Sequence, residues 1–161
     1  IIDMSAEVTD VLLVENDMLE KIGSLPIGTH HVLRSLRDTL NISLNKAESL
    51  LRLYTENHLD EAYEKSLHMT VDTAFMLWFK EFFNLLDQYA QFGILPNTLV
   101  IKTNSFMIEW LREQILKQDS LMEHMHANKR IEVIVLFDTQ DQLAFHDAEL
   151  GIFDVLISAQ K

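Results

Sequence analysis

Two carboxylates lie close together near the start of the chain, where residues 3–10 read DMSAEVTD. Apolar residues stand on both sides, so we expect Asp3 and Asp10 to flank a tight turn between two strands. A turn of this shape that binds phosphate would have glycines between the acids, because side chains block the approach of backbone N–H groups. Residues 5–7, Ser-Ala-Glu, fill that place instead. In the purely structural alternative, Asp3 only ends a strand and Asp10 faces solvent.

Histidines and acids form a second group that could do chemistry. Zinc would need three or four such ligands held in fixed geometry. Polar residues surround the His-x-His pair, and a solvated loop is the commoner explanation for such a segment, so we predict no metal site. We also find no nucleophile, metalloprotease or Walker-type motif and predict no catalytic residue. The possible ligands considered are Glu123, His124, His126, Asp138, His146 and Asp147.

The composition limits the class of protein. The 161 residues contain 25 acidic and 13 basic side chains, for a net charge of −12. Such a charge repels nucleic acid and anionic lipid, so neither is an expected direct partner. No apolar run approaches the ~20 residues that span a bilayer, and we expect no membrane insertion. The chain has no cysteine, which excludes disulfides.

The hydrophobic pattern predicts the elements that position these residues. Strands are expected at residues 1–4, 8–14, 18–25, 98–102 and 131–137, the last as a central strand covered on both faces. Helices are expected at 29–40 with Thr29 as the cap, at 43–54 with Ser43 as the cap, and within 60–90, 105–117 and 147–159. This order predicts an α/β domain with a β-hairpin start, a mixed sheet and helices packed on it.

Several short motifs, in this order, resemble the second lobe of actin-like ATPases, especially the FtsA-type cell-division and PilM-type pilus-assembly proteins. The turn at 3–10 resembles the family's phosphate-binding hairpin, and Leu25-Pro26-Ile27-Gly28 resembles its helix start. Ala47-Glu48 and the strand segment at 94–100 continue the series. The resemblance implies a ribonuclease H-like lobe cut from a longer protein, with a first lobe before Ile1. It also implies a sheet-forming core at 1–56 and 94–161 and a helical subdomain at 57–93.

The resemblance also implies where a nucleotide would bind, if ATP and Mg²⁺ binding is retained. The implied contacts are Asp3, Ser5, Thr9, Asp10, Glu48, Thr103 and Asn104. Three departures from the family's motifs argue against retained nucleotide binding. Glu7 places a negative charge in the phosphate turn, Lys102 to Ser105 replace the family's Gly-Gly adenosine turn, and Leu51 stands where the family has a lysine.

We therefore expect a degenerate lobe with no cofactor, acting as a scaffold or adaptor rather than as an enzyme. By resemblance, its partners would be proteins of a membrane-associated machine for pilus assembly, secretion or cell division, with self-assembly as another mode. Such relatives are peripheral cytoplasmic proteins at the inner membrane. The main alternative is a working ATP-binding lobe.

Aromatic residues concentrate at 75–83, which reads FMLWFKEFF. Core packing is the first expectation for such a cluster. Trp78, Phe106 and Trp110 are nevertheless candidate anchors for a protein partner, since aromatic side chains dominate protein interfaces. In a third alternative, the chain is an unrelated α/β domain whose aromatic cluster holds a small ligand.

Overall fold

A computed structural model describes residues 1–56, 58, 61–125 and 130–136, and structural statements below concern these residues. The elements in chain order are β1 (Ile2–Met4), β2 (Thr9–Glu15), β3 (Met18–Leu25), α1 (Thr29–Leu40), α2 (Leu44–Thr55), α3 (Glu61–Ala90), β4 (Thr98–Lys102), α4 (Ser105–Leu116), α5 (Leu121–His124) and β5 (Glu132–Leu136).

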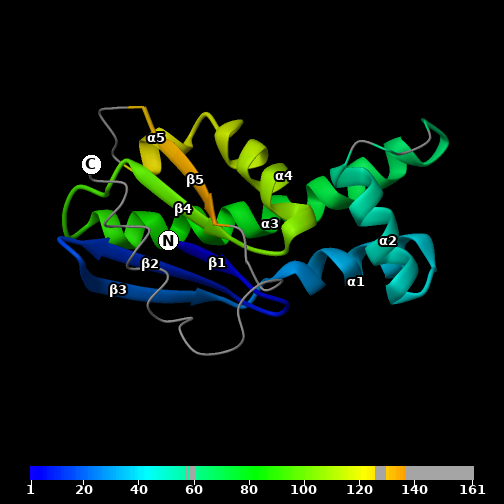
Figure 1. The fold of residues 1–161 in the computed structure, drawn as a ribbon, viewed down its shortest axis with the longest axis horizontal. Helices are drawn as coiled ribbons and strands as arrows, with labels where there is room; N and C mark the ends of the chain where they lie inside the picture. The colour runs from blue at the N-terminus through cyan, green and yellow to red at the C-terminus, as the bar shows by residue number, and fades with distance from the viewer. Residues whose placement is uncertain (57, 59–60, 126–129, 137–161) are drawn as a thin grey trace.

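The strands form one mixed sheet in the order β3-β2-β1-β4-β5 (Figure 1). β3, β2 and β1 are antiparallel neighbours, whereas β4 runs parallel to both β1 and β5. Asn16 and Asp17 connect β2 to β3 with φ angles of 51° and 60°. Both values suit a type I′ hairpin turn, whose twist matches that of the flanking strands. The predicted α/β class, hairpin start and mixed sheet are confirmed.

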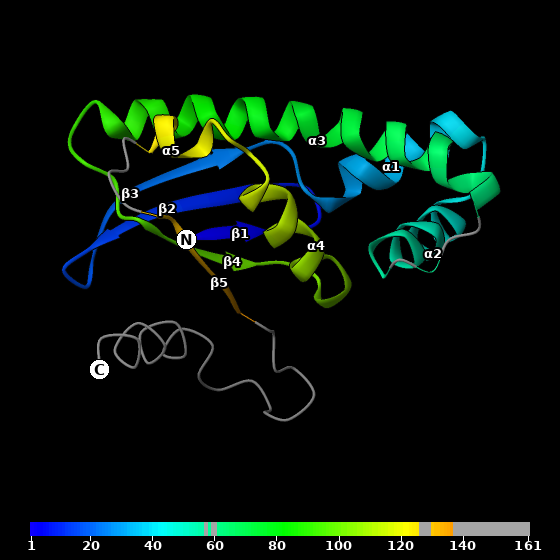
Figure 2. The same ribbon diagram turned by 90° about the horizontal axis from the view of Figure 1, so that it is seen from above.

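The described helices α3, α4 and α5 pack on one face of the sheet. α3 runs lengthwise along this face, and α1 and α2 lie beyond one end of the sheet (Figure 2). Leu99 and Ile101 of β4 join Ile2 in the core that α3 and α4 cover. Alternation along the strands therefore turns Asp3 and Lys102 toward the opposite face.

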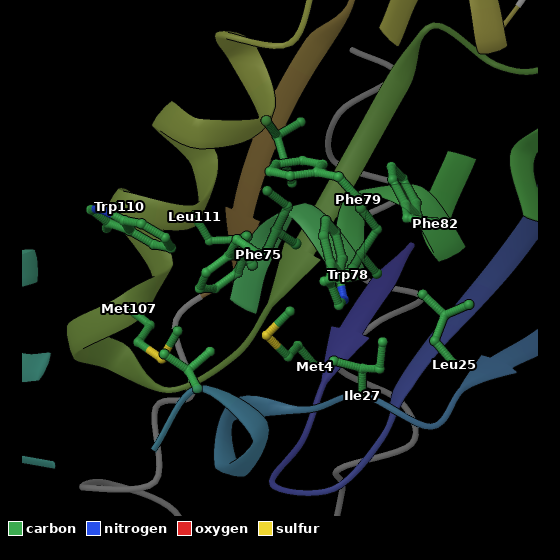
Figure 3. Packing of buried hydrophobic residues seen from close by; sticks show 14 of the residues in the cluster. Met4, Leu25, Ile27, Phe75, Trp78, Phe79, Phe82, Met107, Trp110 and Leu111 are labelled. Atoms are coloured by element: carbon green, nitrogen blue, oxygen red, sulfur yellow. The ribbon is translucent and has the colours of Figure 1, made fainter. Parts of the chain in front are cut away.

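The aromatic residues of α3 form the centre of this core (Figure 3). Trp78 stacks on Phe82 with a centroid distance of 4.9 Å, and Phe75 meets Trp110 of α4 at 4.5 Å. Trp78 and Trp110 are only 1% and 9% exposed, so burial prevents either from serving as an open anchor for a partner. Phe106 is half-buried, with the Arg52 guanidinium 4.9 Å from its ring centroid. Core packing, the first expectation for 75–83, is confirmed.

Two details differ from the sequence-based expectation. β5 lies at the end of the described strand order with half-buried side chains and an exposed Glu132, so the prediction of a doubly covered central strand is wrong for the described sheet. Gly28, not Thr29, is the N-cap of α1, because Thr29 already belongs to the helix. Ser43 caps α2 as predicted and accepts a hydrogen bond from the Lys46 N–H. The helix expected at 147–159 lies outside the described residues.

A buried chain of hydrogen bonds ties three parts of the fold together. The indole Nε1–H of Trp78 donates to the Thr9 hydroxyl at 3.0 Å. That hydroxyl donates in turn to the carbonyl oxygen of Ile27 at 2.7 Å. α3, β2 and the segment that leads into α1 are therefore linked through one fully buried side chain.

We expect Thr9→Val to lower the free energy of unfolding by about 1–3 kcal/mol, because it leaves the Trp78 N–H and the Ile27 carbonyl unsatisfied in the core. Urea denaturation followed by tryptophan fluorescence measures the change. The control is Thr73→Val on the exposed surface of α3, for which we expect a change within about 0.5 kcal/mol. Equal effects of the two substitutions would contradict the role of Thr9.

Candidate functional site

The turn between β1 and β2 is held by its own hydrogen bonds. The Ser5 N–H donates to the Val8 carbonyl at 2.9 Å, and the Ser5 hydroxyl donates to the same oxygen at 2.9 Å. Among the described residues, only Asn16, Asp17 and Asn41 have positive φ. Residues 5–8 therefore take backbone conformations open to any side chain, not the left-handed ones for which a phosphate turn uses glycine.

The start of α1 is docked directly on this turn. The Thr29 N–H donates to the Ser5 carbonyl at 3.0 Å, and the His30 N–H donates to the Ala6 carbonyl at 2.8 Å. The next amide, of His31, donates to the Gly28 carbonyl at 3.0 Å. Amides at a helix N-terminus otherwise bind anions readily. Here the turn's carbonyl oxygens occupy the first two of them.

Gly28 is what permits this close approach. A Cβ at this position would lie 2.5 Å from the Ser5 carbonyl oxygen and 2.6 Å from that of Ala6. Both atoms belong to the backbone and cannot rotate away. In the Pro-Ile-Gly sequence before α1, the glycine is therefore needed so that the backbone can pack directly against the turn.

Glu7 adds an electrostatic link between the turn and α1. Its carboxylate lies 3.0 Å from Nη1 of Arg34 and 3.0 Å from Nδ1 of His30. Hydrogen bonds from His30 and Arg34 hold the pKa of Glu7 below its usual value. The carboxylate therefore stays ionised and neutralises the Arg34 guanidinium beside the turn. His30 and Arg34 are four residues apart and share one helical face, a spacing that could have indicated this cluster, but the pairing with Glu7 was not predicted.

Asp3 and Asp10 are direct cross-strand neighbours on β1 and β2. Each has its own partner: Lys102 Nζ lies 3.5 Å from an Asp3 carboxylate oxygen, and the Ser24 hydroxyl donates to Asp10. Two adjacent carboxylates repel each other, and the lysine reduces that repulsion. The structure thus brings together the two acids predicted from the sequence and adds Lys102 beside them.

The other residues predicted to contact a nucleotide lie farther apart from one another. Thr103 and Asn104 follow β4 directly after Lys102, so they lie at the same end of the sheet as Asp3. The Thr103 hydroxyl is buried without a hydrogen-bond partner among the described residues. Glu48 is exposed on α2. Thr9 belongs to the core, where Trp78 and Ile27 occupy its hydroxyl.

These residues fit a nucleotide poorly. A triphosphate needs free amides and cations, yet the α1 amides are bonded to the turn and Arg34 is paired with Glu7. A carboxylate also stands at the turn; at an effective dielectric near 20, two like charges ~4 Å apart repel by about 4 kcal/mol.

In the described part of the chain, no group of three or more His, Asp or Glu side chains is placed to hold a metal ion. His126, Asp138, His146 and Asp147 lie outside the described residues. Within the same ranges, no helix combines the length and apolar character needed to cross a membrane.

Comparison with solved structures shows an actin-like fold. A chain of the PilM-PilN type IV pilus biogenesis complex is similar with a TM-score of 0.60 and 14% identity, over 92% of this chain and 39% of that chain. The ethanolamine utilization protein EutJ from Carboxydothermus hydrogenoformans is similar with a TM-score of 0.50 and 14% identity, over 83% and 42%. The resemblance predicted from the sequence is confirmed at the level of the fold.

The chain spans 39% and 42% of the lengths of these two solved chains. No protein-family model matches the sequence, and no curated protein matches it. At 14% identity, the similarity shows a shared fold and not a shared activity.

We expect Gly28→Ala to destabilise the protein by about 1–3 kcal/mol, because the new methyl group would collide with backbone oxygens of the turn. Gly93→Ala is a matched control, since nothing lies within 4 Å of a Cβ placed there. Urea denaturation of the two variants measures the difference. If they are equally stable, the turn is not packed against Gly28 as described.

Glu7→Gln should destabilise the protein at neutral pH and have progressively less effect as the solution becomes acidic. The folded pKa of Glu7 lies below the usual 4.5, so its ionic contribution is present above that value and is lost as pH falls through the lowered pKa. Denaturation at a series of pH values checks this, with the exposed Glu20→Gln as the control. A Glu7→Gln effect that does not change with pH would contradict it.

Proposed function

We propose that this actin-like lobe is a protein-binding scaffold that has lost nucleotide binding and turnover. One observation carries the proposal: the turn at residues 5–8 is closed on α1 through the Ser5 and Ala6 carbonyls and the Glu7 carboxylate. In the actin-like ATPases that the sequence resembles, the same turn is the second phosphate loop. Its place here is filled by the chain's own groups.

The proposed setting follows from the resemblance and from one structural neighbour. That neighbour was solved as part of the PilM-PilN type IV pilus biogenesis complex. A scaffold needs a stable platform and an exposed surface but no cofactor. We propose a peripheral, cytoplasmic role in a membrane-associated assembly for pilus formation, secretion or cell division. The division into a sheet-forming core and a 57–93 helical subdomain stays a prediction.

A second candidate is an ATP-binding lobe. It is favoured by the adjacent carboxylates of Asp3 and Asp10 and by the buried hydroxyl of Thr103 at the same end of the sheet, which has no hydrogen-bond partner within the described ranges. In this alternative the two acids would hold Mg²⁺ and water, and Thr103 and Asn104 would contact the nucleoside. The closed turn makes it the weaker candidate.

Isothermal titration calorimetry with ATP and Mg²⁺ separates the two candidates. We expect no saturable binding at millimolar ATP, either to the 161-residue chain or to the longest natural protein that contains it. Binding at micromolar ATP, weakened by Asp10→Asn, would overturn the proposal.

A triple variant tests the cause of the loss. Ser5→Gly, Ala6→Gly and Glu7→Gly together restore bare backbone at the turn. If blockage by these side chains is the main obstacle, the two-lobed protein should gain measurable ATP affinity. Glu20→Gly, at an exposed position away from the turn, controls for the general effect of a glycine on the stability of the protein.

A further inference from the structure

Among the described residues, no further strand pairs with the outer edge of the sheet at β3, and this edge carries apolar side chains. β3 is the terminal strand of the described sheet, on the side away from β5. Three of its side chains are more than half exposed: Met18 at 60%, Leu19 at 56% and Ile22 at 62%. Leu19 pairs with Val14 and Ile22 with Leu12, so both side chains lie on the face of the sheet turned away from α3. We call Leu19 and Ile22 the β3 edge patch. Phe92, which is 79% exposed, lies over Lys21 on the α3 side of the same edge.

The backbone of β3 presents polar groups at this edge that pair with no other described strand. Leu12 exchanges backbone hydrogen bonds with Ile1 at 2.8 and 2.7 Å, so its polar groups point away from β3. Ile22 is the partner of Leu12 in the register. The N–H and C=O groups of Ile22 therefore point outward, and those of Ser24, two residues on, do the same. A further strand could pair with them.

Natural edge strands are often protected by an inward-pointing lysine. Lys21 has this position, but its ammonium group lies against two aromatic rings. Its Nζ lies 3.4 Å from the centroid of Phe92 and 5.6 Å from that of Tyr89. Nζ is buried and has no hydrogen-bond acceptor among the described residues. The charge is thus shielded beneath the rings and does not guard the outer edge.

The charges at the edge indicate what the added strand would carry. Glu15, Asp17 and Glu20 are exposed on the hairpin and surround the patch with negative charge. The whole chain has a net charge of −12. A second copy would bring these carboxylates against their equivalents, which is unfavourable. A basic strand would neutralise them.

We propose that the β3 edge patch is a docking site for an extended segment of another protein, in which apolar residues alternate with lysine or arginine. The segment adds to the sheet by pairing with Ile22 and Ser24, while its apolar side chains cover the patch and its basic ones face the hairpin carboxylates. This inference rests on the scaffold role proposed above and names the surface that would serve it.

The probe is a capped, fluorescent synthetic peptide in which valine alternates with lysine. Fluorescence anisotropy with the full chain should show saturable binding. Ile22→Pro removes the outward N–H without touching the pairing with β2, and Glu20→Lys reverses a facing charge. We expect each to weaken binding about tenfold or more. Ile22→Thr keeps the N–H and controls for the loss of the side chain, and should weaken binding less than Ile22→Pro.

A second readout locates the peptide. Hydrogen exchange followed by NMR should show protection of the Ile22 and Ser24 amides on binding. Circular dichroism confirms that each variant is folded. The inference is overturned if the wild type shows no saturable binding, if Ile22→Pro binds as well as the wild type, or if a valine–glutamate peptide binds equally.

A dimer would also overturn the inference. If sedimentation shows that the wild type self-associates and that Ile22→Pro is monomeric, a second copy occupies the edge. All of these measurements are made without nucleotide. Failure of the docking site therefore leaves the calorimetric test of ATP binding unaffected, and ATP binding would not by itself remove the docking site.

Discussion

The Thr9 hydroxyl is the polar contact on which the arrangement of the site depends. It is fully buried, accepts a hydrogen bond from Trp78 and donates one to the Ile27 carbonyl. Buried polar groups are costly unless satisfied, so these three groups must stay together whenever the core forms. The bond to Ile27 fixes the segment that precedes Gly28. The position of the turn on α1 follows from that constraint, because Gly28 packs on the turn and α1 begins at the next residue.

Much of the fold could be predicted because short-range signals specify it. Alternating apolar residues, the Asn16-Asp17 turn and the Ser43 cap identify β2, β3 and the start of α2 without long-range information. The pairing of Asp3 with Asp10 followed from the expected hairpin. β5 was predicted to be a central strand because an apolar run looks the same in a central and in an edge strand. Its position in the sheet depends on its pairing partners, which the run itself does not reveal. The helix expected at 147–159 falls within 137–161, which lie outside the described residues.

The parts of the site that could not be predicted are set by residues far apart in the sequence. Thr9 was assigned to a nucleotide site, but it is in the core because Trp78, on the long helix α3, reaches it. Glu7 was expected to repel a phosphate. Its attraction to Arg34 depends on how α1 docks on the turn, and no local pattern encodes that docking. Tryptophan is a residue type that is frequent at protein interfaces, which made Trp78 a candidate anchor. The packing of α3 on the sheet buries it in the core instead.

Under the proposed loss of nucleotide binding, the closed turn accounts for a fold that is stable without a ligand. Glycines in a phosphate loop leave the free chain with large conformational entropy, and the bound phosphate compensates for ordering them. Side chains at residues 5–7 reduce that entropy. The bonds from Thr29 and His30 to the turn then satisfy the helix N-terminus without an anion. In the proposed scaffold, the side chains that would block a triphosphate are therefore the same ones that make the turn independent of it.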